Sequence, residues 1–258
     1  MTPTLLLVTL AAALGGAMNA IAGGGTLVTF PAIVALGVPP LIANATSTVA
    51  LWPGTLGSMW GYRKELAGAR QWAIRFAPPS LLGGALGAWL LLRTSAEHFE
   101  RIVPFLVLAA TLVFLIQRPL MRRFRLGRGE EVTREGEEPR SPPWSFEVYQ
   151  FGVGVYGGYF GAGIGILMLA VLGLMGFRNI HRMNGLKNWS GLCMNAVAAA
   201  MFAFSGIVNW PVALAVAVGG LLGGYGGSRL AQAVGQERVR AAVVVIGLGS
   251  FVWLLVRQ

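Results

Sequence analysis

Apolar sequence fills nearly all of this chain, and its only long break is the charged stretch from Arg118 to Pro143. Charged residues make up 12% of the 258 residues, roughly half of the share that is typical of a soluble domain. A helix that crosses the hydrocarbon core of a bilayer needs about 20 residues. We therefore expect an all-α membrane protein, with apolar segments near residues 3–22, 26–37, 41–61, 71–92, 99–117, 146–160, 163–177, 183–204, 210–233 and 240–256.

The formal charge of +10 does not indicate nucleic-acid binding. The basic residues lie between apolar segments, as the positive-inside rule predicts, and do not gather on one helix or one face. The single cysteine, Cys193, excludes a disulfide framework and a cysteine-based metal cluster. We expect no cofactor and no bound metal.

The apolar segments form two sets that repeat. A shift of 139 residues places Gly24 on Gly163 and Gly37 on Gly176, and a shift of 140 places Gly83-Gly84 on Gly223-Gly224. Matches in the same order at a nearly constant offset favour duplication over chance similarity between glycine-rich chains. The expected organisation is a first transmembrane repeat (1–117), a charged cytoplasmic linker (118–144) and a second transmembrane repeat (145–258).

The distribution of basic residues predicts how the repeats are oriented. Segments 26–37 and 163–177 are too short to span upright, so each pairs with the segment before it, either as a hairpin or as a broken helix that crosses once. Broken helices would make the two repeats parallel and place the basic loop 178–187 outside, so the charges favour hairpins. With the linker inside the cell, this arrangement places 17 basic residues inside and three outside. We therefore expect inverted-topology repeats, each a glycine-broken short-helix hairpin plus three transmembrane helices, with both termini periplasmic. Whether each hairpin spans or re-enters stays open.

Each hairpin turns at a glycine cluster, within 22–26 in the first repeat and 161–165 in the second. A helix that begins after such a break directs free backbone N–H groups and its positive dipole end into the gap. Two inverted hairpins would bring both starts to the middle of the bilayer, where they would bind an anion. The alternative is that these glycines only allow close helix packing. The candidate residues are Gly23, Gly24, Gly25, Thr26, Gly163 and Gly165.

Polar residues follow each hairpin at the start of a long helix. Hydroxyl and amide groups donate hydrogen bonds to oxyanions, and Lys187, opposite Thr48 at the shift of 139, would supply a cation. The alternative is that Lys187 extends to the cytoplasmic interface. These candidates are Asn44, Thr46, Ser47, Asn184, Lys187 and Asn188, and the weaker ones are Asn19, Thr29, Tyr156, Tyr159 and Asn195.

Short motifs recur along the whole chain, at residues 22–27 with Pro31, 37–39, 43–48, 61–63, 182–188 and Asn209-Trp210. Together these motifs resemble the TauE/SafE family, also called the 4-toluene sulfonate uptake permease family. The resemblance covers essentially the whole chain and implies a multi-pass exporter of the bacterial inner membrane that carries sulfite or small organosulfur anions such as sulfoacetate. The second half lacks the Thr-Ser pair of the first, so the two half-sites are not chemically equivalent.

The charged residues also bear on the driving force. The chain has no aspartate, and every glutamate lies in an expected loop or at a segment end, whereas proton- and sodium-coupled carriers usually keep a carboxylate inside the membrane. We expect anion efflux driven by the membrane potential. The expected partners are a small anionic substrate and the lipid bilayer, not nucleic acid, and a homo-oligomer is left open.

Three other classes of membrane protein are alternatives to an anion exporter. A metal-cation carrier needs carboxylates or His/Cys clusters in the membrane, but His98 and His181 lie near loops. An enzyme needs a nucleophile–base or metal pair, and the apolar segments contain none. A non-transporting assembly subunit has no need of broken helices at matching positions.

Overall fold

The computed structural model describes residues 3–22, 25–127, 143–175, 177, 179–234 and 236–257, and its regular structure in these residues is entirely helical. The all-α expectation is therefore confirmed for the described part of the chain. In chain order the helices are α1 (Pro3–Ala22), α2 (Thr26–Ala35), α3 (Pro40–Gly61), α4 (Arg63–Ala67), α5 (Arg70–Arg93), α6 (Ala96–Gly127), α7 (Trp144–Tyr159), α8 (Ile164–Leu174), α9 (Ile180–Ser205), α10 (Trp210–Val234) and α11 (Gln236–Val256).

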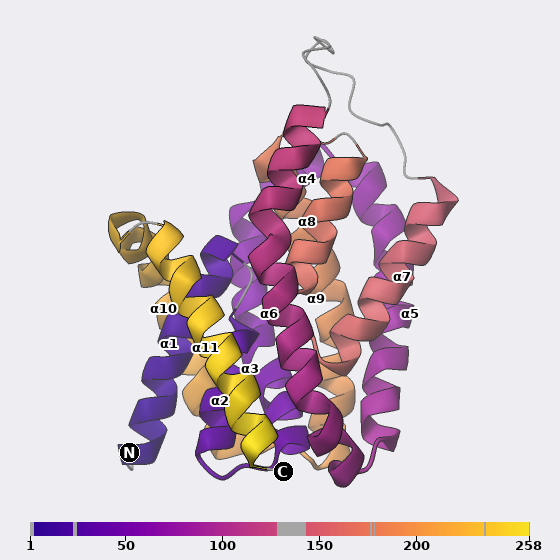
Figure 1. The fold of residues 1–258 in the computed structure, drawn as a ribbon. Coiled ribbons are helices and arrows are strands. Elements are labelled where there is room, and N and C mark those ends of the chain that lie inside the picture. The colour runs from indigo at the N-terminus through magenta and orange to yellow at the C-terminus, as the bar shows by residue number, and fades with distance from the viewer. Residues whose placement is uncertain are drawn as a thin grey trace.

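The helices run roughly along one axis, which gives the bundle two ends (Figure 1). We call the end where α6 stops and α7 begins the linker end, and the end that holds both chain termini the terminal end. α3 and α6 run from the terminal end to the linker end, and α5, α9 and α11 run the opposite way. α1 and α2 enter and leave at the terminal end, whereas α7 and α8 enter and leave at the linker end.

Two of the helices are too short to cross a bilayer. α2 has 10 residues and α8 has 11, which at the helical rise gives each a length of about 15 Å, half of a hydrocarbon core. Neither hairpin is therefore long enough to cross such a core upright with both arms. Among the residues that the structure describes, one helical stretch, Ala96–Ile116 in α6, is both long and apolar enough on its own to qualify as a span, and shorter apolar stretches occur in α1, α2, α8, α10 and α11.

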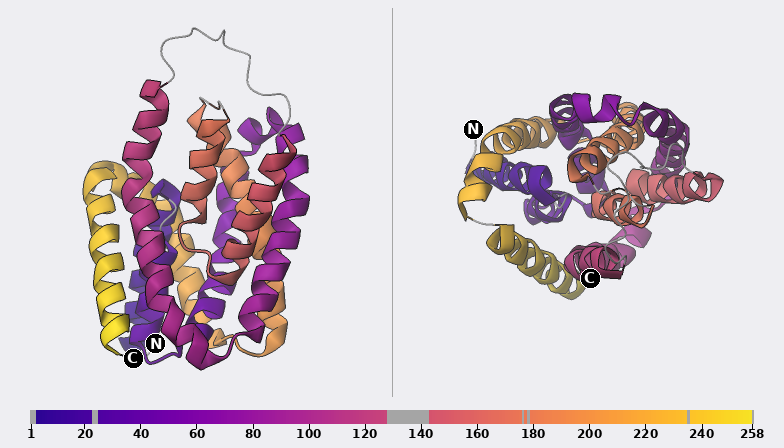
Figure 2. Two further views of the ribbon diagram at one scale, coloured as in Figure 1. Left: turned by 45° about the vertical axis from the view of Figure 1, so that its right-hand side comes forward. Right: turned by 90° about the horizontal axis from the view of Figure 1, so that it is seen from above.

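Glycines let particular helices approach closely. α1 packs mainly against α10, and α5 packs mainly against α7, on opposite sides of the bundle (Figure 2). A Cβ added to Gly16 would lie 2.9 Å from the Gly220 Cα, and one added to Gly83 would lie 2.9 Å from the Gly154 Cα. Such close van der Waals contact stabilises helix association in lipid, because lipid tails are as apolar as the side chains and the hydrophobic effect does not drive helices together there.

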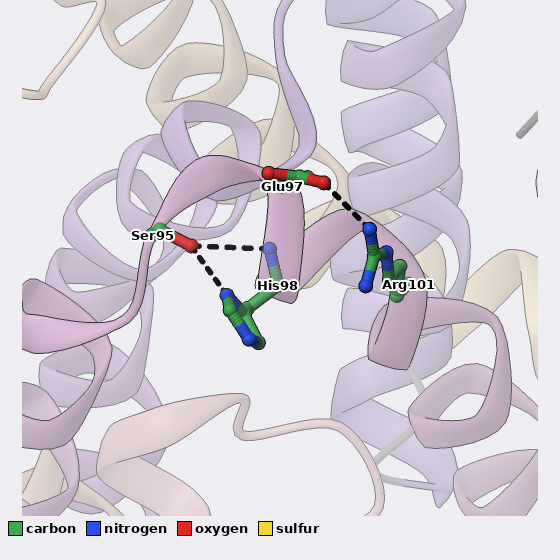
Figure 3. Close-up of polar contacts among 4 residues, drawn as sticks. All are labelled: Ser95, Glu97, His98 and Arg101. Carbon is green, nitrogen blue, oxygen red and sulfur yellow. Dashed lines mark hydrogen bonds and ion pairs between the residues drawn. The ribbon is translucent and has the colours of Figure 1, made fainter.

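The start of α6 at the terminal end is held by local polar contacts (Figure 3). The Ser95 hydroxyl accepts a hydrogen bond from the His98 backbone N–H at 3.3 Å, which caps the helix, and it lies 2.7 Å from the His98 Nδ1. One turn on, Arg101 pairs with Glu97 at 2.6 Å. His98 thus takes part in a helix cap on the exposed surface.

The outer surface of the bundle is apolar. Large hydrophobic side chains are exposed on most of the long helices, including Leu82 at 64% and Leu222 at 66%. Exposed apolar surface on this scale fits contact with lipid tails and not with water.

One expected boundary differs from the structure. The apolar segment was expected to end at 117, where the linker starts, but α6 continues to Gly127. Arginine and leucine, which dominate this extension, favour the helix, so charge marks the end of the apolar stretch and not the end of the helix. The rest of the expected linker, residues 128–142, lies outside the described residues.

Candidate functional site

The turn between α7 and α8 is built on two glycines with left-handed backbone conformations. Gly161 has φ +80° and Gly163 has φ +81°, a region that other residues rarely adopt. The Tyr156 hydroxyl, one turn before the end of α7, donates to the Ala162 carbonyl at 2.8 Å and fixes the turn. α8 therefore begins abruptly at Ile164. The Gly163 carbonyl accepts from the backbone N–H of Ile166 at 3.0 Å, and the N–H groups of Ile164 and Gly165 are left without a partner within the helix.

The corresponding break in the first hairpin precedes α2. Gly25 is buried, and its carbonyl accepts hydrogen bonds from the backbone N–H groups of Val28 and Thr29 at 3.1 and 3.0 Å. These bonds start α2 at Thr26. The other two glycines expected here, Gly23 and Gly24, lie outside the described residues.

Both helix starts border one central cavity of about 90 Å³. This volume holds several water-sized groups, since one water needs about 10–15 Å³ measured in this way. The walls come from α2, α3, the α7–α8 turn, α8 and α9. The lining residues are Thr26, Thr48, Leu51, Trp52, Thr55, Phe160, Gly161, Ile164, Gly165, Met168, Lys187, Asn188, Gly191 and Asn195.

Lys187 is the only charged side chain among these lining residues. Its side chain is buried, with 9% of the residue exposed, and its aliphatic stem lies against Gly165. A buried ammonium without a counter-charge is unfavourable, so the cavity attracts an anion. The dipoles of α2 and α8 also favour an anion, since each helix presents its positive end to the cavity.

Neutral polar groups complete the lining. The amides of Asn188 and Asn195 and the Thr26 hydroxyl supply further hydrogen-bond donors. The hydroxyls of Thr48 and Thr55 donate instead to carbonyls of their own helix, at 3.0 and 2.6 Å. In the described part of the chain, no three His, Cys, Asp or Glu side chains come together in a way that could hold a metal ion.

Three expected site residues on α3 are buried but do not line the cavity. The Asn44 amide donates to the Tyr159 carbonyl at 2.8 Å, and the Thr46 hydroxyl accepts from the backbone N–H of Asn209 at 3.0 Å. The Ser47 hydroxyl lies 3.1 Å from that of Thr29. These contacts join α3 to α7, to the start of α10 and to α2. Their location favours a structural role over direct contact with a substrate.

The other expected residues divide between the cavity and its surroundings. Thr26, Gly165, Lys187 and Asn188 line the cavity, as does the weaker candidate Asn195. Gly163 caps α8 and packs near Ala110, and Asn184 is half-buried one turn from the cavity-lining residues of α9. Of the remaining weaker candidates, Tyr159 contacts Thr94, and the Asn19 side chain lies outside the described part of the structure.

Sequence reasoning missed the cavity face of α3. Thr48, Leu51, Trp52 and Thr55 recur at the three- and four-residue spacing of one helical face. That spacing starts from Thr48, which belongs to the polar run of α3 but is not among the expected site residues. This face gives a weak signal in the sequence, because all four residues are apolar or weakly polar and the stronger polar residues of α3, Asn44 and Ser47, lie elsewhere on the helix. The other lining residues not expected were Phe160, Gly161, Ile164, Met168 and Gly191.

The lining residues pair up under the shift found in the sequence. A shift of 139 residues places Thr26 on Gly165, Thr48 on Lys187 and Trp52 on Gly191, and all six line the cavity. Six of the fourteen lining residues therefore occupy matching positions of the two sets of helices. The paired residues differ in chemistry. The two sets of helices therefore contribute matching backbone positions to the cavity, but only the second set contributes a charge, at Lys187.

The cavity lies on the linker side of the bundle. Its residues on α8 extend from the helix start toward the linker end (Figure 1). Those on α3 begin near the middle of that helix, at Thr48, and continue toward the linker end as far as Thr55. On the terminal side the two hairpins meet through Phe30 and Phe160, whose rings contact edge to face at 5.5 Å. Both rings are almost fully buried, and Phe160 also borders the cavity. The two buried rings thus close the terminal side of the cavity where the hairpins meet.

Comparison with known proteins gives one consistent result. The family model described as "Sulfite exporter TauE/SafE" matches residues 8–254. A probable membrane transporter protein of Haemophilus influenzae is 30% identical over 89% of this chain and 86% of its own length. The probable membrane transporter protein ORF9 of Sinorhizobium sp is 28% identical over 95% of this chain and 90% of its own length. The probable membrane transporter protein YfcA of Escherichia coli K12 is 29% identical over 91% of this chain and 83% of its own length. No solved structure matches the chain significantly.

Proposed function

The chain belongs to the TauE/SafE family, and from this premise we propose that it is a secondary transporter that exports a small anion across the bacterial inner membrane. The proposed substrate is sulfite or an organosulfur anion such as sulfoacetate. The family description names sulfite, and the three relatives are each named as probable membrane transporters. The chemistry of the cavity supports an anion as the substrate, whereas the choice of sulfite or an organosulfur anion rests on the family description.

One observation carries the proposal. Lys187 is buried in a cavity that two helix N-termini border and that no acidic side chain lines. An oxyanion in this cavity would meet the ammonium, the backbone N–H groups of Ile164 and Gly165, and the amides of Asn188 and Asn195. Charge-assisted hydrogen bonds of this kind are about twice as strong as neutral ones. The mixture of Trp52, Met168 and polar groups also suits a substrate with a short apolar part.

The proposed architecture is a pair of inverted repeats. It is supported by the two hairpins, which enter the bundle from opposite ends (Figure 2). It is also supported by the packing pairs: α1 with α10 is the counterpart of α7 with α5, and α3 with α10 is the counterpart of α9 with α5. The matched residues of the cavity are a third and independent support.

The proposed mechanism is alternating exposure of this site. With the linker end cytoplasmic, as the basic residues predict, the described state faces the cytoplasm and is closed toward the periplasm. To open the terminal side, Phe160 must move away from Phe30. The hydrogen bonds of Asn44, Thr46 and Ser47 to neighbouring elements must also break. An inside-negative potential drives a monovalent anion outward with about 2.3 kcal/mol per 100 mV, so the cavity needs no carboxylate for a coupling ion.

Flux into protein-loaded liposomes tests the proposal. Liposomes of known orientation are exposed to sulfite, sulfoacetate, sulfate or chloride under an imposed potassium-diffusion potential. We expect sulfite or sulfoacetate flux that follows the potential. Flux that requires a pH gradient when the potential is clamped to zero would contradict the mechanism, and the absence of flux for all four anions would contradict the proposed substrate class.

A further inference from the structure

A second cavity, of about 310 Å³, lies at the linker end between α4, α5 and α9. It shares no lining residue with the central cavity. Nothing in the proposed transport cycle uses it. Its lining residues are Arg63, Leu66, Ala67, Arg70, Ala73, Ile74 and Trp189.

The lining of this cavity combines two cationic groups with an apolar surface. Arg63 and Arg70 are exposed and contribute the only charges among the lining residues. The other five side chains are aliphatic or aromatic. Glu65 lies on the same short helix as Arg63 but is not part of the lining. The cavity therefore favours a ligand that has a negative group and an apolar part.

The two chemistries are ordered along the membrane axis. Arg70 begins α5, and Ile74 follows one turn later, about 6 Å deeper into the bundle. Ile74 is 57% exposed and leads into the exposed apolar face of α5 that includes Leu82. The Trp189 ring is fixed in the wall by a hydrogen bond from its Nε1 to the Ala73 carbonyl at 2.8 Å. In a bilayer whose surface lies at the linker end, the basic groups would lie at headgroup level and the apolar groups at the level of the upper acyl chain.

We propose that this cavity binds an anionic phospholipid from the leaflet at the linker end, with its phosphate at Arg63 and Arg70 and the start of an acyl chain along Ile74 and Trp189. A free phosphate ion would leave the apolar walls without a partner. A zwitterionic lipid would bring its own cation to a cavity whose lining holds two positive charges and no carboxylate. Basic pockets between helices on the cytoplasmic side are a recognised setting for anionic lipid headgroups.

Native mass spectrometry of the detergent-purified protein tests the proposal, with phosphatidylglycerol and phosphatidylcholine as the two lipid probes. We expect the wild type to retain phosphatidylglycerol in preference to phosphatidylcholine. Arg63→Gln and Arg70→Gln should each lower the affinity for phosphatidylglycerol about fivefold, since one basic residue near a membrane surface contributes about 1 kcal/mol. Ile74→Asn should also lower it, whereas excess glycerol phosphate should not displace the lipid.

Lys64→Gln is the matched control, because Lys64 is exposed on the same helix α4 but does not line the cavity. It should bind phosphatidylglycerol as the wild type does. Unchanged phosphatidylcholine binding in every variant shows that the fold is intact. Equal retention of the two lipids by the wild type, an equal loss in Lys64→Gln, or displacement by glycerol phosphate would each overturn the proposal.

Discussion

The aliphatic stem of Lys187 lies directly against Gly165, and a Cβ added to Gly165 would stand 3.1 Å from the Lys187 Cδ. Gly165 is in the first turn of α8, and Lys187 is in the second turn of α9. The absence of a side chain at 165 therefore lets the ammonium lie beside the start of α8. This contact joins the two features on which anion binding depends, the cation and the helix N-terminus.

A larger side chain at position 165 should displace Lys187. In Gly165→Val the branched side chain occupies the space of the lysine stem, so we expect anion flux to fall about tenfold or more, in line with the loss of one charge-assisted hydrogen bond. Flux into liposomes measures the effect. Gly152→Val is the control, because an added Cβ there meets nothing within 4 Å. Full flux in Gly165→Val would show that the position of Lys187 does not matter.

Removal of the cation should separate binding from stability. Lys187→Met keeps the apolar stem and deletes the charge, so we expect anion affinity to fall about 10- to 100-fold. The thermal midpoint of the anion-free protein should stay the same or rise, since a buried charge without a partner is replaced by an apolar group. Lys64→Met, at the only other lysine in the chain, should change neither quantity. A large loss of stability with unchanged affinity would assign Lys187 a purely structural role.

Sequence reasoning located the backbone of the site better than its side chains. The glycine clusters and the shift of 139 residues pointed to the hairpin turns, and both described helix starts border the cavity. Lys187 was identified because a lysine in an apolar helix is unusual. These signals depend on residue type alone, and such signals remain visible in a sequence that is apolar throughout.

The polar run on α3 shows why the rest was missed. Asn44, Thr46, Ser47 and Thr48 were grouped because they are adjacent in the sequence, but consecutive residues on a helix point about 100° apart and do not all face one cavity. The structure turns Thr48 to the cavity and turns Thr46 and Ser47 to neighbouring helices. Which face is the cavity face depends on the packing of α9 and α10, and the sequence of α3 does not contain that information.

The hydrogen bond from the Asn44 amide to the Tyr159 carbonyl should help hold the terminal side closed. Its loss in Asn44→Ala should shift the equilibrium toward the state open to that side by about fivefold, the effect of one buried hydrogen bond of about 1 kcal/mol. Thr26→Cys in a Cys193→Ala background, which removes the native cysteine, reports the shift through labelling by a membrane-impermeant thiol reagent from the periplasmic side.

The control for this shift is Ser205→Ala, which removes only local hydrogen bonds at the end of α9, one to the Phe202 carbonyl and one from the backbone N–H of Ile207. Its labelling from the periplasmic side should equal that of the Thr26→Cys parent. Equal labelling in the Asn44→Ala variant would mean that the Asn44–Tyr159 contact does not take part in the closure.

The close approach of α5 and α7 should be sensitive to a single methyl group. In Gly83→Ala the new Cβ would stand 2.9 Å from the Gly154 Cα, so the helices must separate. Overpacking of this kind costs about 1–3 kcal/mol, and we expect a clear fall in the thermal midpoint in detergent. Gly249→Ala adds a methyl group with no neighbour within 4 Å and should leave the midpoint unchanged. Because alanine has the higher helix propensity, a fall of equal size in both variants would mean that the close contact between α5 and α7 does not set the effect.

The most direct measurement is the location of a bound anion in an experimental structure of the protein prepared with selenite, an analogue of sulfite whose selenium gives an anomalous signal. The account predicts one strong selenium peak in the central cavity, within hydrogen-bond distance of the Lys187 Nζ and beside the starts of α2 and α8. The peak should disappear in Lys187→Met. A selenium site elsewhere in the bundle, or an empty cavity at selenite concentrations that support transport, would contradict the central claim.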